Sequence, residues 1–250
     1  MSDIYVISTG RNASSYVKNC VDSVQRQTLQ PTKHILIDDI SDDDTVEYIS
    51  EYKKQNISNL QTIINKERKY RLKNIYENAI DKNPDDIICL VDSDDWLAND
   101  TALQTIFDTY NNNKKLEYVY SQYNFSHGAL GSCEQIPSNN WDPYKNRWIT
   151  SHMSTFKVSA IKDIPIENFL DWNGKWFEIA TDHALTLPIL YSLRKRDGDY
   201  SSVSFINEVL YTHAFYGNPS KPRSGTPEAD QRSKNAVRCS TYIKQRGYIE

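Results

Sequence analysis

The chain has 250 residues, and its 33 acidic and 29 basic side chains give a formal net charge of −4. This balance excludes binding to nucleic acid or to an anionic membrane surface by bulk charge alone. The length predicts one large domain, and a hydrophobic content of 38% is enough for one sizeable core. The four cysteines are far apart and form no CxxC pair, so the sequence indicates neither a zinc site nor a disulfide framework.

The first half of the chain alternates short apolar runs with amphipathic segments. Strands are predicted over 4–8, 34–38, 61–65 and 87–91. The first helix is predicted to begin at an N-cap, Asn12 or Ser14, and to end near Gln27; the second begins at Thr45 or Val46; the third carries Leu72, Ile75, Ala79 and Ile80 on one face. Strands that alternate with helices predict an α/β fold with a mostly parallel central sheet flanked by helices.

Beyond residue 100 the pattern is less regular. The predicted elements are a helix over 101–110, strands over 117–123 and 154–158, a helix over 182–193 and a strand pair near 203–211. A long connection, 126–148, and an aromatic-rich loop, 169–177, separate them. Residues 217–234 contain three Pro, two Gly and several charges, so we expect a flexible segment there.

No run of about eighteen apolar residues, the length that a membrane span needs, occurs in the sequence. The N-terminal residues lead directly into a strand-like segment instead of a signal peptide. We therefore expect a cytoplasmic protein without a transmembrane segment.

Acidic side chains are concentrated where two predicted strands end. Residues 38–47 hold six acids and residues 81–100 hold seven. Ligands of such sheets bind beyond the carboxyl ends of the strands, and carboxylates packed this closely suit a hard divalent cation. Mn²⁺ or Mg²⁺ completes its shell with water and phosphate oxygens, which points to a phosphorylated ligand. Asp42, Asp43 and Asp44 have a simpler role, because they precede a predicted helix and favour its positive end.

Four segments in order carry a resemblance to a known family. They are IYVISTGRN (4–12), VDSVQRQT (21–28), ILIDDISDDDT (35–45) and LVDSDDWL (90–97). Together they resemble the family 2 glycosyltransferases with the GT-A fold, over residues 3–110. The resemblance implies a nucleoside diphosphate sugar donor, with UDP favoured and GDP or dTDP open. It also implies an inverting single displacement by a hydroxyl of a glycan or other acceptor.

The resemblance divides the chain into parts. Residues 1–215 are predicted to be the GT-A domain, with a nucleotide-sugar-binding half over 1–110 and an acceptor half over 111–215. Residues 216–250 are predicted to be a C-terminal extension that is partly flexible. An acceptor carried by a membrane would place the enzyme at the membrane surface. The oligomeric state stays open.

Several positions match donor-binding and metal-binding residues of the family. Asp39 matches the acid that reads the nucleobase, and Thr9 matches the residue that lines the base pocket. Asp92 matches the first Asp of the DxD motif, near ribose and metal, and Ser93 follows it among the donor-binding residues. Asp94 is the first choice for direct metal ligation and Asp95 is the second.

Two further residues complete this set. Arg71 resembles the basic residue that meets the base or the phosphates, and a solvated helix charge is its alternative. His213 lies where related enzymes supply a late metal or diphosphate ligand, although a lone His is also often structural. The motifs depart from the family pattern at residues 9–12, Thr-Gly-Arg-Asn, where Pro-x-Tyr-Asn is usual, and at Ile40, where Gly is usual.

The catalytic base belongs to the second half of the chain. An inverting transfer needs a carboxylate that removes the proton of the attacking hydroxyl. The resemblance places this base at Asp182, which could also cap the helix that it begins, and Glu178 is the rival base. Trp172 and Trp176 offer flat surfaces for an acceptor sugar, or are half-buried packing residues. His152 is placed near donor or acceptor.

The leading hypothesis is therefore a metal-dependent inverting glycosyltransferase with Mn²⁺ or Mg²⁺ as its cofactor. The alternative is a non-catalytic nucleotide-sugar-binding or scaffold domain of a larger glycan-synthesis assembly. A nucleotidyltransferase is a third class, but those enzymes usually carry a Gly-rich phosphate loop, and Gly10 stands alone here. Residues 194–246 hold ten Lys and Arg against five acids, a basic end suited to a diphosphate or an anionic acceptor, or simply a solvated tail.

Overall fold

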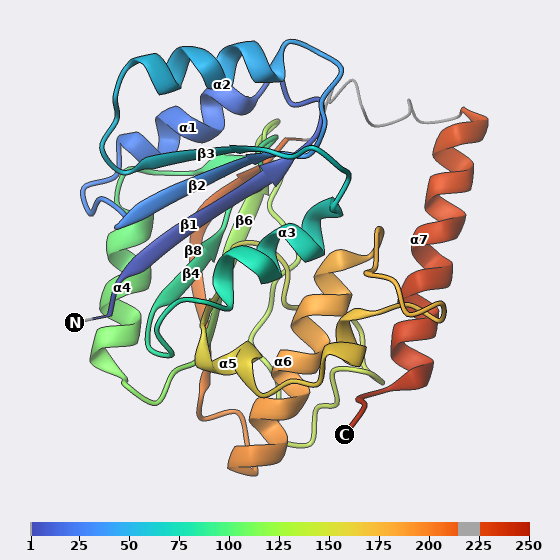
Figure 1. Ribbon diagram of the computed structural model, residues 1–250. Helices are drawn as coiled ribbons and strands as arrows, with labels where there is room; N and C mark the ends of the chain where they lie inside the picture. The colour runs from blue at the N-terminus through green and yellow to red at the C-terminus, as the bar shows by residue number, and fades with distance from the viewer. Residues whose placement is uncertain (1, 215–225) are drawn as a thin grey trace.

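The computed structural model describes residues 2–214 and 226–250, which form an α/β fold around one twisted sheet (Figure 1). The strands are β1 Ile4–Gly10, β2 Lys33–Asp38, β3 Leu60–Ile64, β4 Ile87–Leu90, β5 Trp96–Leu97, β6 Tyr118–Phe125, β7 Ser154–Lys157 and β8 Val203–His213. The helices are α1 Val17–Gln25, α2 Thr45–Lys54, α3 Tyr70–Ala79, α4 Ala102–Asn112, α5 Ser159–Lys162, the 3₁₀ helix η1 Ile166–Phe169, α6 Thr181–Asp197 and α7 Pro227–Arg246.

The sheet has the strand order β3-β2-β1-β4-β7-β6-β8-β5. Strands β3, β2, β1 and β4 are parallel, whereas β7 runs antiparallel to both of its neighbours, β4 and β6. Strand β8 is parallel to β6, and the short β5 is antiparallel to β8. One sheet thus crosses both predicted halves, and the carboxyl ends of β1, β2 and β4 meet at one edge.

Helices cover both faces of this sheet. In Figure 1, α1 and α2 lie above it and α3, α5 and α6 lie below it. All four side chains of strand β4 are buried, as they are in a central parallel strand. This burial explains why residues 87–90 form a wholly apolar run. The predicted α/β class and central parallel strands are confirmed.

Three details differ from the sequence-based expectations, and the first is the start of α1. The residue before this helix is Tyr16, which makes no side-chain cap, so neither Asn12 nor Ser14 is the N-cap. Asn12 has a positive φ of 54°, and its side-chain oxygen accepts a hydrogen bond from the Asp42 backbone at 2.9 Å. This side chain is committed to the acidic turn after β2 and is not available to the helix.

The second difference is that residues 203–213 form one strand and not a strand pair. Strand β8 pairs with β6 along its whole length, but the register shifts where Ser121 faces Ile206 and Gln122 faces Val209. The polar residues Asn207 and Glu208 therefore form a bulge within one strand, where their composition suggested a turn.

The third difference concerns the segment predicted to be flexible, residues 217–234. Residues 217–225 lie outside the described part of the chain. Residues 227–234 form the first turns of α7, which begins with Thr226 as N-cap: its side chain accepts a hydrogen bond from the Ala229 backbone at 3.2 Å, and Pro227 occupies the first turn. Among the described residues, none of the helices combines the length and apolar character that crossing a bilayer requires.

A buried histidine on β2, the strand beside the edge strand β3, predicts acid sensitivity. His34 on β2 is 0% exposed and lies 2.9 Å from the Ser8 hydroxyl on β1, and burial lowers its pKa from 6.5 to about 3. Because the unfolded chain binds this proton below pH 6.5 and the folded chain does not, stability is lost as pH falls from 6.5 toward 3. We expect about 2–3 kcal/mol of this loss by pH 4.5.

Urea unfolding of the wild type and His34→Gln at pH 7 and pH 4.5 measures this contribution. The loss of stability between the two pH values should be smaller in the variant by that amount, since acid effects of the carboxylates are common to both proteins and cancel. Equal losses would show that His34 does not carry the acid sensitivity.

Candidate active site

A cleft of about 460 Å³ lies at the sheet edge where β1, β2 and β4 end. Residues from both halves of the chain and from α7 line this cleft. They are Thr9, Gly10, Arg11, Asp39, Arg68, Tyr70, Arg71, Asp92, Asp94, His152, Glu178, Ile179, Ala180, Thr181, Asp182, His213 and Arg232. The predicted residues Thr9, Asp39, Arg71, Asp92, Asp94, His152, Glu178, Asp182 and His213 therefore share one cavity.

One end of the cleft is formed by Thr9 and Asp39. Thr9 is 4% exposed, and its hydroxyl has no hydrogen-bond partner within the described residues. A buried hydroxyl without a hydrogen-bond partner lowers the stability of the folded state. Such a hydroxyl in a cleft wall suits a ligand that forms the missing hydrogen bond.

Asp39 is held by the segment that begins α3. Its carboxylate accepts bonds from the Arg68 side chain at 3.1 Å and from the backbone N–H groups of Lys69 and Tyr70 at 2.9 Å each. The positive φ of Tyr70, 60°, turns that N–H toward the carboxylate. Burial opposes the charge of Asp39, but these bonds, with one from Asn65, lower its pKa below the usual value. Asp39 is thus an ionised, rigid acceptor at the cleft wall.

The two departures from the family motifs contact each other. Arg11 donates from Nε to the backbone oxygen of Ile40 at 2.7 Å and from its guanidinium to Asp42 at 2.9 Å. Ile40 has a φ of 62°, a conformation that favours glycine and is strained for a β-branched residue. Arg11 therefore holds, by a charged hydrogen bond, a turn for which glycine is usual.

Arg71 joins two carboxylates that come from opposite halves of the chain. Its Nε donates to Asp92 at 2.6 Å, and its guanidinium lies 2.9 Å from Asp182 Oδ1. The Arg71 side chain is 17% exposed, Asp92 is 21% exposed and Asp182 is 47% exposed. Arg71 is therefore a mostly buried side chain that is paired with two carboxylates, and not the solvated helix charge that the sequence also allowed.

Asp182 lies in the first turn of α6. The residue before this helix, Ala180, has a positive φ of 60°. Burial would raise the pKa of Asp182, but the positive charge of Arg71, followed by contributions from His152, His183 and His213, lowers it. The carboxylate stays ionised at neutral pH while its side chain remains open to the cleft. Ala180 is the N-cap residue of α6, so Asp182, in the first turn, is not the N-cap that the sequence allowed.

The acidic turn after β4 brings several carboxylates together. Burial raises the pKa of Asp92, Arg71 lowers it, and the neighbouring Asp95, Asp182 and Asp94 raise it further, with a net upward shift. One ligand oxygen from each of Asp92, Asp94 and Asp95 lies within 4.8 Å of the others. Oxygen ligands this close together fit a hard cation such as Mn²⁺ or Mg²⁺.

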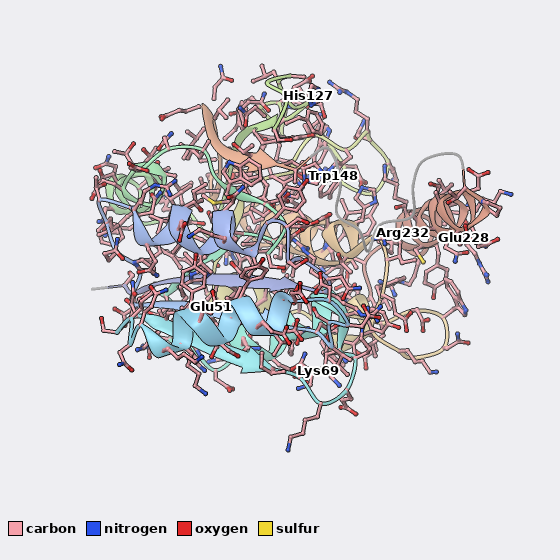
Figure 2. The ribbon with its side chains drawn as sticks, turned by 90° about the horizontal axis from the view of Figure 1, so that it is seen from above. Glu51, Lys69, His127, Trp148, Glu228 and Arg232 are labelled. Carbon is pink, nitrogen blue, oxygen red and sulfur yellow. The ribbon has the colours of Figure 1, made fainter. Side chains whose placement is uncertain are left out.

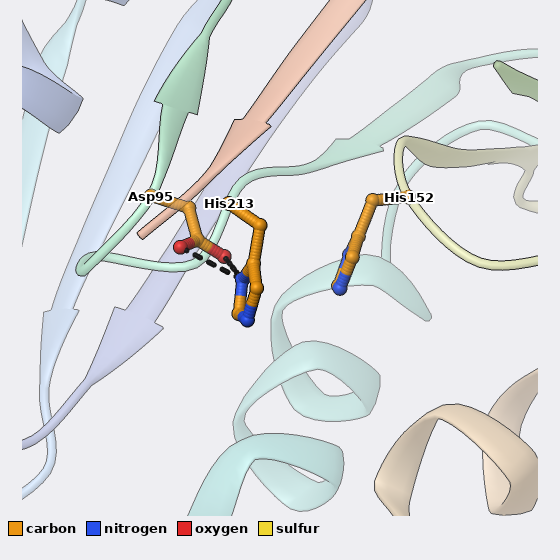
Figure 3. A group of neighbouring side chains, drawn as sticks. All are labelled: Asp95, His152 and His213. Atoms are coloured by element: carbon orange, nitrogen blue, oxygen red, sulfur yellow. Dashed lines mark hydrogen bonds and ion pairs between the residues drawn. The ribbon is translucent and has the colours of Figure 1, made fainter. Parts of the chain in front are cut away.

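Asp95 differs from its two neighbours because protein groups already surround it. It is 0% exposed and accepts bonds from the Tyr211 hydroxyl at 2.5 Å, from His213 Nδ1 at 3.0 Å and from the Ala214 backbone at 2.8 Å. Figure 3 shows the Asp95 carboxylate facing the His213 ring, with His152 beside it. A carboxylate bound to one ring nitrogen is the usual means of orienting a metal-ligating His through the other nitrogen.

His152 is packed against this pair of residues. Its ring stacks on Tyr211, with centroids 4.6 Å apart, and on His213, at 5.4 Å. A second group of possible metal ligands consists of Asp95, His152 and His213, with one ligand atom of each within 4.8 Å of the others. The stack holds both imidazoles at the cleft wall.

Ser93 has a different position from the other DxD residues. It is 3% exposed and is not among the residues that line the cleft. A Cβ added at Gly10 would lie 1.8 Å from the Ser93 hydroxyl, so this close approach of β1 to the acidic turn requires glycine. Gly10 therefore has a packing role, which the sequence reading did not assign.

The aromatic loop places its two tryptophans separately. Trp176 packs with Tyr76 at 5.2 Å and with Phe169 at 6.3 Å, as a structural side chain does. Trp172 is 40% exposed and lies against Arg238 and Tyr242 of α7. Glu178 lines the cleft and accepts a hydrogen bond from the Tyr70 hydroxyl. Burial, and then this hydrogen bond, raise the pKa of Tyr70.

Sequence reasoning missed Arg68, Tyr70 and Arg232 in this cleft. In Figure 2, Arg232 lies on the side of α7 that faces the body of the molecule. The excess of basic residues near the C-terminus was the signal for Arg232, but no motif singles it out from its neighbours.

The chain is similar to one sequence family and to several solved structures. A family model described as Glycosyl transferase family 2 matches residues 5–165. No curated protein sequence matches the chain. Among solved structures, S. aureus TarS aligns with a TM-score of 0.62 and 16% identity, over 86% of this chain and 37% of that one.

Two structures with bound donors are similar as well. TarS 1–349 in complex with UDP-GlcNAc has a TM-score of 0.61 and 16% identity, over 89% of this chain and 62% of that one. The mannosyltransferase PcManGT from Pyrobaculum calidifontis, in complex with GDP-Man and Mn²⁺, has a TM-score of 0.64 and 12% identity, over 99% of this chain and 65% of that one. The chain thus spans from 37% to 65% of the length of these proteins, and the likeness confirms the predicted GT-A fold.

Proposed function

Since the chain belongs to glycosyl transferase family 2, we propose that it transfers a sugar from a nucleoside diphosphate sugar to a hydroxyl of a glycan or other acceptor, with inversion. UDP is the proposed nucleotide. One observation carries the proposal: Arg71 contacts Asp92 and Asp182 at once, so a donor-side acid and a base from the acceptor half share one cleft.

The donor would lie along the sheet edge. Thr9 and Asp39 suit the nucleobase, because one offers a buried hydroxyl without a partner and the other an ionised acceptor. Arg71 and Arg232 bring positive charge to the same cleft, which suits a diphosphate. The donor complexes of TarS with UDP-GlcNAc and of PcManGT with GDP-Man support a ligand of this class.

We propose that Asp92 and Asp94 hold Mn²⁺ or Mg²⁺. Asp95 belongs to one group of possible ligands with these two residues and to another with His152 and His213, so we propose His213 as a further ligand, which Asp95 orients. This differs from the sequence-based ranking, in which Asp95 was the second choice for direct ligation. When bound, the cation offsets the charge of the departing diphosphate. The Mn²⁺ complex of PcManGT supports a divalent cation in this fold.

Asp182 is the proposed base. It would accept the proton of the acceptor hydroxyl while that oxygen forms a bond to the anomeric carbon and the bond from this carbon to the diphosphate breaks. Attack from the side opposite the leaving group inverts the anomeric carbon. Arg71 keeps Asp182 ionised beforehand, since the Asp182 pKa is lowered by that positive charge.

Thermal unfolding with a panel of nucleotide sugars tests donor binding. We expect one nucleotide class, UDP sugars, to raise the Tm in the presence of Mn²⁺ by about 5 °C at saturating donor, and much less with EDTA. Donor hydrolysis in the same samples separates an enzyme from a non-catalytic binding domain. If no nucleotide sugar stabilises the protein with Mn²⁺, the proposed function is wrong.

A further inference from the structure

We propose that the acceptor is a neutral saccharide chain, and that it lies in a groove between the loop 171–179 and one face of α7. The groove is defined by Trp172, Phe177 and Glu178 of the loop and by Asn235, Arg238 and Tyr242 of α7. This inference rests on the proposed function, because it identifies the acceptor of that reaction.

The groove adjoins the cleft. A second cavity of about 200 Å³ shares Glu178 and Ile179 with the cleft, and it is lined on the other side by Asn235 and Arg238. A third hollow of about 390 Å³ shares Trp172 and Arg238 with the second. The second and third cavities form the groove, which thus lies beside the cleft that Asp182 lines.

One face of α7 forms a wall of this groove. Arg232, Asn235, Arg238 and Tyr242 are spaced by three or four residues, so they lie on the same side of the helix. With a rise of 1.5 Å per residue they span ~15 Å, which is longer than one sugar ring. Arg232 and Arg238 are exposed, whereas Asn235 is partly buried and Tyr242 packs against the core, so this face is open over part of its length.

The chemistry of the groove suits sugars. The Trp172 ring is 40% exposed, with the Arg238 guanidinium 4.3 Å from its centroid and Tyr242 edge-on at 5.3 Å. Aromatic rings pack on the apolar face of a ring ligand, while planar groups such as guanidinium, amide and carboxylate bind its hydroxyls. Single rings interleaved with polar groups do not form the continuous apolar patch that a lipid chain needs.

The charges of the groove favour a neutral chain over a polyanion. Two acids, Asp171 and Glu178, line the second cavity together with one base, Arg238. The Asp171 carboxylate accepts bonds from the Asn173 and Lys175 backbone at 2.7 and 3.0 Å. The hydroxyl at one end of the saccharide would reach Asp182, and the remaining units would follow α7 away from the cleft.

Binding can be measured without any transfer, through Cys239. This cysteine lines the second cavity and is partly exposed, whereas Cys20, Cys89 and Cys133 are buried, so alkylation by iodoacetamide reports on the groove. The probes are mono- to tetrasaccharides of glucose, galactose, mannose and N-acetylglucosamine. We expect at least one trisaccharide to slow Cys239 alkylation in the wild type, with Trp172→Ala raising the concentration needed by about tenfold.

Transfer to the same saccharides gives the second measurement, with the donor that the wild type hydrolyses. The kcat/KM for the trisaccharide should exceed that for the monosaccharide by at least about tenfold, and Trp172→Ala and Arg238→Ala should each remove most of this preference. Val237→Ala, on an α7 side chain that is 66% exposed, is the matched control and should keep it. Thermal unfolding of each variant verifies that α7 remains folded.

The outcomes separate the two proposals. Protection of Cys239 without donor hydrolysis would refute the proposed function and keep the saccharide groove. Donor hydrolysis with no protection by any saccharide, or with a trisaccharide preference that survives both groove variants, would refute the groove and keep the function.

Discussion

Asp182→Asn is expected to lower kcat for sugar transfer by about 10²- to 10⁴-fold, the range that one general base contributes. Donor binding should persist, because the amide keeps the size of the side chain and Arg71 retains its 2.6 Å bond to Asp92. The loss should therefore appear in kcat, with little change in the donor concentration that gives half-maximal stabilisation. Initial rates and thermal shifts on the same protein measure the two quantities.

Glu178→Gln is the matched control, because Glu178 is the rival carboxylate in the same cleft. Glu178 accepts a hydrogen bond from the Tyr70 hydroxyl, whereas Asp182 is paired with Arg71, which also contacts Asp92. We expect a much smaller loss of kcat in this variant. A reversed result, with Asp182→Asn active and Glu178→Gln inactive, would move the catalytic role to Glu178.

Asp94→Ala is expected to remove metal-dependent donor stabilisation and to lower kcat by about 10³-fold, since charge neutralisation by a cation contributes several kcal/mol to such a reaction. The physical reason is that Asp94 lies in one group of close carboxylate oxygens with Asp92 and Asp95, a set of ligands that suits a hard cation. Titration of Mn²⁺ against Tm, with and without donor, measures the loss of metal affinity separately from activity.

Asp44→Ala is the control for this prediction. Asp44 precedes α2, is exposed, and does not line the cleft, so removing its charge changes the net charge equally without touching the site. Its Mn²⁺ response should equal that of the wild type. An Asp94→Ala protein with full activity and an unchanged Mn²⁺ response would exclude Asp94 as a metal ligand.

Both predictions depend on Arg71, which holds the proposed base and the first acid of the DxD motif together. In the proposed function, a bound donor and its cation would place a diphosphate and a positive charge beside this residue. The ion pair between Arg71 and Asp182 would then connect the donor side to the proposed base.

Local patterns in the sequence predicted most of the strands and most of the helices, although β5 was not predicted and β8 was expected to be a strand pair. Apolar runs and helical spacing depend on neighbours a few residues away, and acids that follow strands must meet at one sheet edge once the strands are parallel. For these reasons the acids after β2 and β4 could be placed together. The resemblance to the family then added Thr9, Arg71, Asp182 and His213 before their contacts were known.

The tertiary structure alone decided what each of these residues contacts. The sequence does not show that Arg71 bridges Asp92 and Asp182, that Asp95 supports His213, or that Arg11 holds the turn at Ile40. Nor does it show that α7, beyond the predicted domain, brings Arg232 to the donor cleft. Such pairings depend on how distant segments pack, and residue spacing carries information about near neighbours only.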